Sequence, residues 1–99
     1  MKDKKNTKEI FIKARKERKK ILLTFFSGQY SLFYTKLCIP IQYIHPINEY
    51  EHDYFYFWDE QADAGDRLFG LPPEDIVIIE ATEENYDPND YIIPNVSGV

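Results

Sequence analysis

The fold of this chain is decided by residues 32–44, whose sequence is LFYTKLCIPIQYI. Side chains alternate along it with a period of two, which predicts a long β-strand with one face toward a core. We expect the odd positions to form that inward face: Phe33, Thr35, Leu37, Ile39, Ile41 and Tyr43. Pro40 cannot donate a hydrogen bond to a neighbouring strand, so it predicts an edge, a bulge or a bend.

Shorter strands are predicted on both sides of this one, at residues 21–27, 54–58, 67–71 and 76–81. No helical pattern separates them, which favours an antiparallel sheet over a parallel one. The aromatic strand 54–58 is interpreted as core packing, the alternative being a stacking platform for bases. The prediction is a mainly β fold, a small antiparallel five-stranded barrel whose long, bent strand serves two sides.

A basic helix is predicted before the first strand, over residues 7–19. Asn6 and Glu9 have the spacing of a capping box. Ile10 and Ala14 recur at helical spacing, so we expect a narrow apolar stripe that docks on the barrel. We divide the chain into a basic N-terminal helix (1–19), a small β-barrel domain (20–92) and a flexible C-terminal tail (93–99).

Charge is unevenly distributed along the chain. Residues 1–20 carry a net charge of +7, and residues 21–99 carry −12, with Lys36 and Arg67 as their only Lys or Arg. The basic helix is open to three interpretations: contact with nucleic acid, contact with the acidic body of this chain or of a second copy, or simple solvation. Repulsion between the acidic body and phosphate argues against nucleic acid as the main partner.

Composition indicates a cytoplasmic protein. The chain of 99 residues has a single cysteine, which excludes an internal disulfide framework. The longest apolar runs fall far short of the ~20 residues of a membrane span. No apolar stretch of signal-peptide length follows the first lysines. We therefore expect neither export nor a membrane partner.

No set of residues has the pattern of an enzyme site. Glu49, Glu51, His52 and Asp53 suggest a metal site on paper, but one imidazole beside carboxylates is explained equally well by a solvated loop. Cys38 lies in the middle of the long strand, where partial burial is the ordinary interpretation. The prediction is a non-enzymatic protein with no catalytic residue, no metal and no cofactor.

The order of the strand motifs provides a resemblance to a known family. Residues 53–59 (DYFYFWD), 67–71 (RLFGL), 76–80 (IVIIE) and 84–88 (ENYDP) follow the strand that carries Pro40. This order resembles the WYL domain, a small Sm-like or SH3-like β-barrel of bacterial transcription regulators and defence-associated proteins. The resemblance covers roughly residues 20–92.

The resemblance implies a stand-alone regulatory or ligand-sensing module. Tyr54 matches the tyrosine of the WYL pattern, and Arg67, Phe69 and Leu71 match its first arginine, its phenylalanine and its leucine. Gly70 stands where the pattern has its second arginine. The implied ligand-binding residues are Tyr54, Arg67 and Phe69, with Arg67 as the anchor of a small anionic ligand or, equally, as the partner of a neighbouring Asp.

A second function class stays open. The acidic body also fits a protein-interaction domain that binds a basic partner or self-associates as a homodimer. The expected partner is thus a small anionic ligand or a protein, and its identity is unknown from the sequence.

Overall fold

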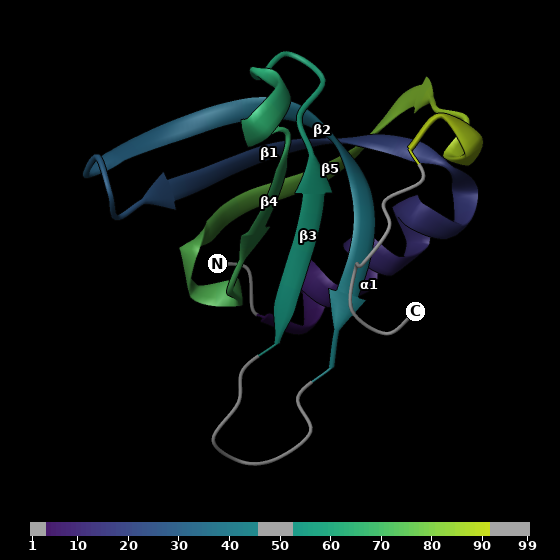
Figure 1. Cartoon of the computed structure of the whole chain (residues 1–99). Helices are drawn as coiled ribbons and strands as arrows, with labels where there is room; N and C mark the ends of the chain where they lie inside the picture. The colour runs from purple at the N-terminus through teal and green to yellow at the C-terminus, as the bar shows by residue number, and fades with distance from the viewer. Residues whose placement is uncertain (1–3, 46–52, 92–99) are drawn as a thin grey trace.

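The computed structural model describes residues 4–45 and 53–91 of the chain. Its helix and strands run in the following order: α1 (Lys4–Glu17), β1 (Lys19–Ser27), β2 (Leu32–Ile44), β3 (Tyr54–Trp58), β4 (Leu68–Leu71) and β5 (Ile76–Asn85) (Figure 1). Short 3₁₀ helices occupy Ala64–Asp66, Pro73–Asp75 and Pro88–Tyr91. The predicted tail (93–99) and the loop that carries His52 lie outside the described residues. Of the described helical segments, none has the length and apolarity needed to cross a membrane.

All five strands belong to one antiparallel sheet in the order β4-β3-β2-β1-β5. The predicted mainly β, five-stranded architecture is confirmed. The sheet curls strongly (Figure 1), yet β4 and β5 remain its two edges in the described pairing, so it is an open sheet and not a closed barrel. Strand β2 joins the two halves, pairing with β1 from Leu32 to Cys38 and with β3 from Ile39 to Ile44.

A β-bulge lies at the point where β2 changes partner. The register with β3 shifts between Pro40 and Gln42, as the proline predicted. The predicted inward face of β2 is wrong in its first half: Phe33 is 66% exposed, while Cys38 on the even side is buried, and the burial of Ile39 on the odd side agrees with the prediction. An extra residue reverses the alternation, and after the bulge Tyr43 on the odd side packs against the core. One continuous period therefore cannot describe both halves of β2.

Helix α1 begins and ends earlier than predicted. It starts at Lys4, so Asn6 lies inside the helix and the predicted capping box is wrong. Helix α1 ends at Glu17, and Arg18, with a φ of 60°, turns the chain into β1. The predicted docking is confirmed, because α1 packs on β1, β2 and β5 with Phe11 and Ala14 fully buried.

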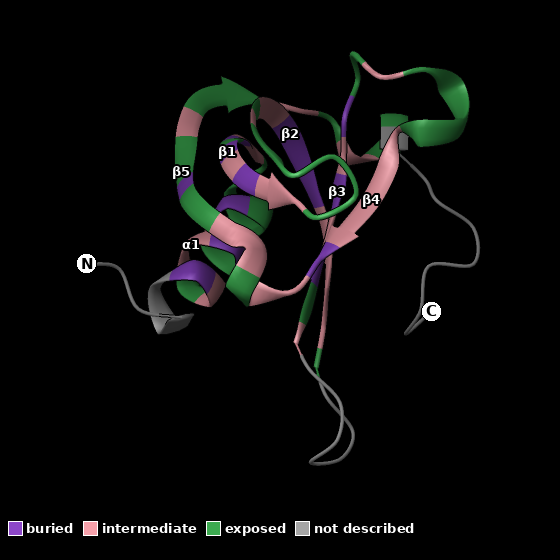
Figure 2. Ribbon diagram, turned by 90° about the vertical axis from the view of Figure 1, so that its left-hand side faces the viewer, coloured by how far each residue is buried: buried purple, intermediate pink, exposed green. Residues whose placement is uncertain are grey.

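The core lies between α1 and the concave side of the sheet, and Figure 2 shows buried segments on α1 and on the strands. Phe11 is central to it, since its ring lies 5.1 Å from Phe55 and 5.4 Å from Phe57, measured between centroids. The interpretation of 54–58 as core holds for these two residues of β3. The core cluster consists of Phe11, Ala14, Ile21, Leu23, Phe25, Cys38, Phe55, Phe57, Leu71 and Ile79.

Candidate functional site

A groove of about 660 Å³ runs between the β1–β2 hairpin and β4. Five aromatic residues line it, and three of them, Phe25, Tyr34 and Phe69, come from different strands. The Phe25 ring links the other two, with centroid distances of 5.9 Å to Tyr34 and 5.4 Å to Phe69. Small-molecule sites have volumes of about 300–1,000 Å³, and this groove falls within that range. We call this hollow the β4 groove.

The polar lining of the β4 groove includes an ion pair between β2 and the residue that follows β3. Lys36 Nζ donates to Asp59 Oδ2 across 2.6 Å, and the second carboxylate oxygen of Asp59 accepts the N–H of Gln61 at 2.9 Å. Asp59 is only 2% exposed. A buried carboxylate is tolerated when both of its oxygens are hydrogen-bonded and its charge is paired. Asp59 therefore fixes the ammonium group of Lys36 beside the aromatic walls.

Phe69 is the predicted ligand-binding residue that lines the β4 groove. Its ring also stacks on Phe57, with centroids 5.5 Å apart. One ring thus joins the groove to the core beneath it. A ligand in the groove would touch a side chain whose position is fixed by core packing.

Arg67 lies immediately before β4 and was predicted to be within it; the strand begins at Leu68. Its side chain folds back on the preceding loop, where Nε donates to the carbonyl oxygen of Ala62 at 3.0 Å. Its own carbonyl oxygen accepts the N–H of Asp59 at 2.8 Å. Among the described residues, the carboxylate of Asp59 pairs with Lys36 and not with Arg67. Arg67 therefore stands in the loop that borders the groove, between two lining residues, Asp66 and Leu68.

Tyr54 lies apart from the β4 groove, over Gly70. Its ring is 5.8 Å from that of Tyr56, which pairs directly with Gly70. A Cβ atom at Gly70 would come within 2.7 Å of the Tyr56 ring and 3.0 Å of the Tyr54 ring. The position where the WYL pattern has its second arginine is thus covered by two tyrosines. Of the three predicted residues, the structure brings Phe69 and the Arg67 loop together and places Tyr54 elsewhere.

Lys36 and Tyr34 were missed by the sequence reasoning. Both lie on the even side of β2, which the period-two pattern assigned to the outside. A usable signal was present, because Lys36 is one of only two bases in residues 21–99. A base within an apolar strand points either to solvent or to a buried acid, and here Asp59 is that acid.

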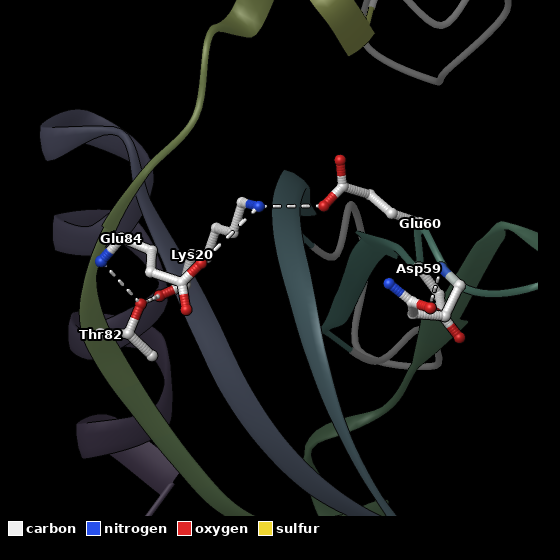
Figure 3. Close-up of polar contacts among 6 residues, drawn as sticks. Lys20, Asp59, Glu60, Thr82 and Glu84 are labelled. Atoms are coloured by element: carbon white, nitrogen blue, oxygen red, sulfur yellow. Dashed lines mark hydrogen bonds and ion pairs between the residues drawn. The ribbon is translucent and has the colours of Figure 1, made fainter.

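A second charged cluster connects β1 with β5 and with the loop after β3 (Figure 3). Lys20 Nζ lies 3.0 Å from Glu60 Oε1, in the loop after β3, and 3.9 Å from Glu84 Oε1 on β5. The hydroxyl of Thr82 donates to the carbonyl oxygen of Lys20 at 2.9 Å. At this lysine, the basic N-terminal region is neutralised by the acidic body of the same chain.

Cys38 is a core residue with an unreactive thiol. Burial raises its pKa from the ordinary 9.0 to about 12, so the thiol stays protonated at neutral pH. Its neighbours in the core cluster are aromatic and aliphatic side chains. Of the residues proposed around His52, only Asp53 lies in the described part of the chain, since residues 46–52 are not described. Within the described ranges, no three His, Cys, Asp or Glu side chains gather as a metal site would require.

Comparison with known proteins identifies a fold and no family. No family model matches the chain, and no curated protein matches it. Among solved structures, proteasome accessory factor B/C (PafBC) of Arthrobacter aurescens is similar, with a TM-score of 0.67 and 12% sequence identity. The match covers 83% of this chain but only 12% of that one. The architecture described above thus recurs as a small part of a much longer protein.

Proposed function

We propose that this chain is a non-enzymatic regulatory or ligand-sensing module of the WYL type. The observation that carries the proposal is the fold shared with a segment of PafBC, together with the order of strand motifs that resembles the WYL pattern. The proposal takes that matched segment to be of the same type. A module of this kind would act by binding a ligand and changing its contacts with a partner.

The ligand is a small anion held in the β4 groove. Phe69, Phe25 and Tyr34 offer apolar and aromatic surface, and Lys36 offers a positive charge. Asp59, Asp66 and Asp75 also line the groove and outweigh this one charge, so a second base is needed to favour an anion. Arg67 supplies it in this proposal, because its loop borders the groove and its guanidinium can hold a carboxylate or phosphate with two hydrogen bonds. Rotation of the Arg67 side chain would break its hydrogen bond to the carbonyl oxygen of Ala62 and bring the guanidinium group to the groove.

A thermal-shift experiment tests this site. ADP, GTP and an oligothymidylate of eight nucleotides serve as probes, each at millimolar phosphate and constant ionic strength. A ligand that binds only the folded state at 100 times its Kd adds about 2.7 kcal/mol of stability, which is readily visible as a rise in Tm. We expect a rise for the intact chain with at least one probe and its loss in Arg67→Ala.

Lys19→Ala is the matched control, because it removes one positive charge outside the β4 groove. The control should retain the rise in Tm. Equal rises in the intact chain and in Arg67→Ala would remove Arg67 from the site. No rise with any of the three probes would contradict the anion-sensing function.

The second candidate function is an acidic protein-interaction domain, and the edge strand β5 favours it. Val77 and Ile78 are 47% and 41% exposed, and Glu80 and Glu83 lie further along the same strand, both exposed. An uncovered edge strand can pair with a strand of another chain. The glutamates would select a basic partner strand.

Light scattering tests whether the second candidate acts by self-association. Self-association that depends on charge should give a dimer at low ionic strength and a monomer in 0.5 M salt, where charges about 10 Å apart are screened. Val77→Lys should weaken pairing with a basic lysine-containing strand through like-charge repulsion, and should leave the Tm unchanged. A monomer at every salt concentration would exclude self-association through charge.

A further inference from the structure

The bulge in β2 gathers three segments that are distant in sequence. It leaves the carbonyl groups of Pro40 and Ile41 available to side chains from other elements. The Nε–H of Arg15, on the last turn of α1, donates to the Ile41 oxygen at 2.6 Å. The hydroxyl of Tyr86, just after β5, donates to the Pro40 oxygen at 3.4 Å. The end of the helix, the bulge and the segment after β5 are therefore held together.

A groove of about 640 Å³ lies where these segments meet. Its polar lining consists of Arg15, Lys16, Arg18, Gln42, Tyr43 and Tyr86, and none of these residues lines the β4 groove. We call it the helix-end groove. None of the described residues that line it is acidic, although the chain as a whole has a net charge of −5. All three cations come from the basic segment 1–20, and this groove is where the segment meets the bulge and the residues after β5.

Two of the cations lie close to a single phenol group. Burial raises the pKa of Tyr86, while the positive charges of Arg15 and Arg18 act in the opposite direction. The bond to Ile41 uses only Nε of Arg15, so it orients the guanidinium without using its two terminal nitrogens. Asp87 follows Tyr86 in the chain, and its Oδ1 accepts the N–H of Asn89 at 2.9 Å. This hydrogen bond holds the Asp87 carboxylate in a local turn.

Arg18 holds a left-handed conformation that favours glycine. Its φ is 60°, at the position directly after the helix where glycine is the common residue. The local hydrogen bonds of Arg18 use its backbone alone: its N–H donates to the Arg15 oxygen at 3.3 Å, and its carbonyl accepts the Tyr86 N–H at 3.0 Å. A glycine at position 18 would make both of these hydrogen bonds, because they use backbone atoms only. A strained residue at a position where the fold does not need its side chain indicates a role for that side chain.

The geometry points to a phosphate-binding site in the helix-end groove. Arg15, Lys16 and Arg18 would surround the oxygens of a phosphate or diphosphate group, which arginines hold with paired hydrogen bonds. Gln42 and Tyr86 add polar groups at the wall, and Tyr43 adds an aromatic surface. The negative end of the helix dipole opposes an anion here, so recognition rests on the side-chain charges. The inference goes beyond the anion proposed for the β4 groove, since the two hollows share no lining residue.

Inorganic pyrophosphate is the probe for this site, titrated into the ¹⁵N-labelled chain at constant ionic strength. We expect saturable shifts of the Arg15 side-chain resonance and of the Lys16 and Arg18 amides. Arg18→Gly should weaken binding by about tenfold or more, as the loss of a charge-assisted hydrogen bond does. The same variant should unfold at an equal or higher temperature, because glycine relieves the strain. Weaker binding in a chain that is no less stable cannot be explained by a damaged fold.

The double variant Lys13→Gln/Lys19→Gln controls for charge, since both residues are outside the groove. Its affinity for pyrophosphate should stay within about twofold of the intact chain, and that of Arg15→Gln/Arg18→Gln should be lost. Competition by ADP would identify a mononucleotide as the source of the phosphate, and competition by the oligothymidylate alone would identify a nucleic-acid backbone. Absence of saturable shifts, or equal loss in both double variants, would overturn the site.

Discussion

Arg15 on helix α1 donates its Nε–H to the carbonyl oxygen of Ile41, 26 residues further along the chain, across 2.6 Å. Ile41 is the extra residue of the bulge at which β2 leaves β1 and joins β3. The bond therefore ties the position of the helix to the bend of the sheet. Together with the Phe11 ring contacts, it explains how a helix with a narrow apolar stripe is held at one orientation.

Removal of the Phe11 side chain should undo this docking. Phe11 is fully buried between the rings of Phe55 and Phe57, so Phe11→Ala leaves a cavity and should cost about 3–5 kcal/mol of unfolding free energy. Urea denaturation followed by circular dichroism measures this loss. Ile12→Ala, at a neighbouring residue that is 44% exposed, should change stability by about 0.5 kcal/mol or less. Similar losses in the two variants would contradict the described face of the helix.

Asp59 should contribute to stability through its hydrogen bonds to Lys36 and Gln61. Asp59→Ala removes the buried carboxylate that accepts both hydrogen bonds. The variant should lose about 1.5–3 kcal/mol of unfolding free energy, the range for hydrogen bonds that involve a charged group. Lys20→Ala breaks the more solvent-accessible pairs with Glu60 and Glu84, and should cost at most about 1 kcal/mol. Thermal unfolding at neutral pH checks both. A larger loss in Lys20→Ala would show that the pairs of Lys20 with Glu60 and Glu84, and not the pair of Asp59 with Lys36, stabilise the fold more.

Gly70 should resist substitution. The Cβ atom of Gly70→Ala would meet the Tyr56 and Tyr54 rings at 2.7 and 3.0 Å, and displacement of two rings should cost about 1–3 kcal/mol. Gly65→Ala is the control, because nothing lies within 4 Å of its Cβ position. That substitution should leave the Tm nearly unchanged or slightly raised. Tolerance of alanine at Gly70 would mean that the two rings do not cover the strand.

The buried thiol of Cys38 predicts a loss of stability at alkaline pH. Its pKa is 9.0 when unperturbed and about 12 in the folded state, so between these values the unfolded chain releases a proton that the folded chain keeps. The folded state then binds more protons, and its stability falls as pH rises, by about 1.4 kcal/mol per pH unit for this group. Below pH 9 the thiol is protonated in both states, and its full contribution to the stability of the fold is present.

The difference in unfolding free energy between the intact chain and Cys38→Ala isolates this effect, because all tyrosines and lysines are common to both. The advantage of the intact chain should shrink between pH 8.5 and 10.5, as measured by urea denaturation under reducing conditions. A difference that is constant over this interval would mean that the thiol is accessible to water.

The strands were predictable because their residues report local preferences. Strand β3 has the predicted bounds. The aromatic and branched residues of β1 and β5 predicted both strands, although β5 continues to Asn85. The bulge was expected at Pro40, but its effect on side-chain direction depends on pairing with β3, which no local pattern encodes. The predicted helix start is wrong because a capping preference is worth only about 1 kcal/mol, and the helix runs through Asn6 back to Lys4.

The candidate sites were less predictable for the same reason. Lys36 faces the β4 groove beside Asp59, which lies directly after β3 and 23 residues away in the sequence. The grouping of Arg15 and Arg18 with Tyr86 depends on the bulge and on the path of the chain after β5. Sequence spacing cannot reveal such non-local groupings. The resemblance to the WYL pattern identified the segment of Arg67 and Phe69, but not the positions that their side chains take.

The most direct test of the account is an NMR titration of the intact ¹⁵N-labelled chain with the probe, among ADP, GTP and the oligothymidylate, that raises its Tm most. An anion-sensing module with its site in the β4 groove predicts saturable shifts at Lys36, Phe69 and the loop from Asp59 to Arg67, and their loss in Arg67→Ala. Shifts that avoid all of these residues, or no saturable shift with any probe, would contradict it.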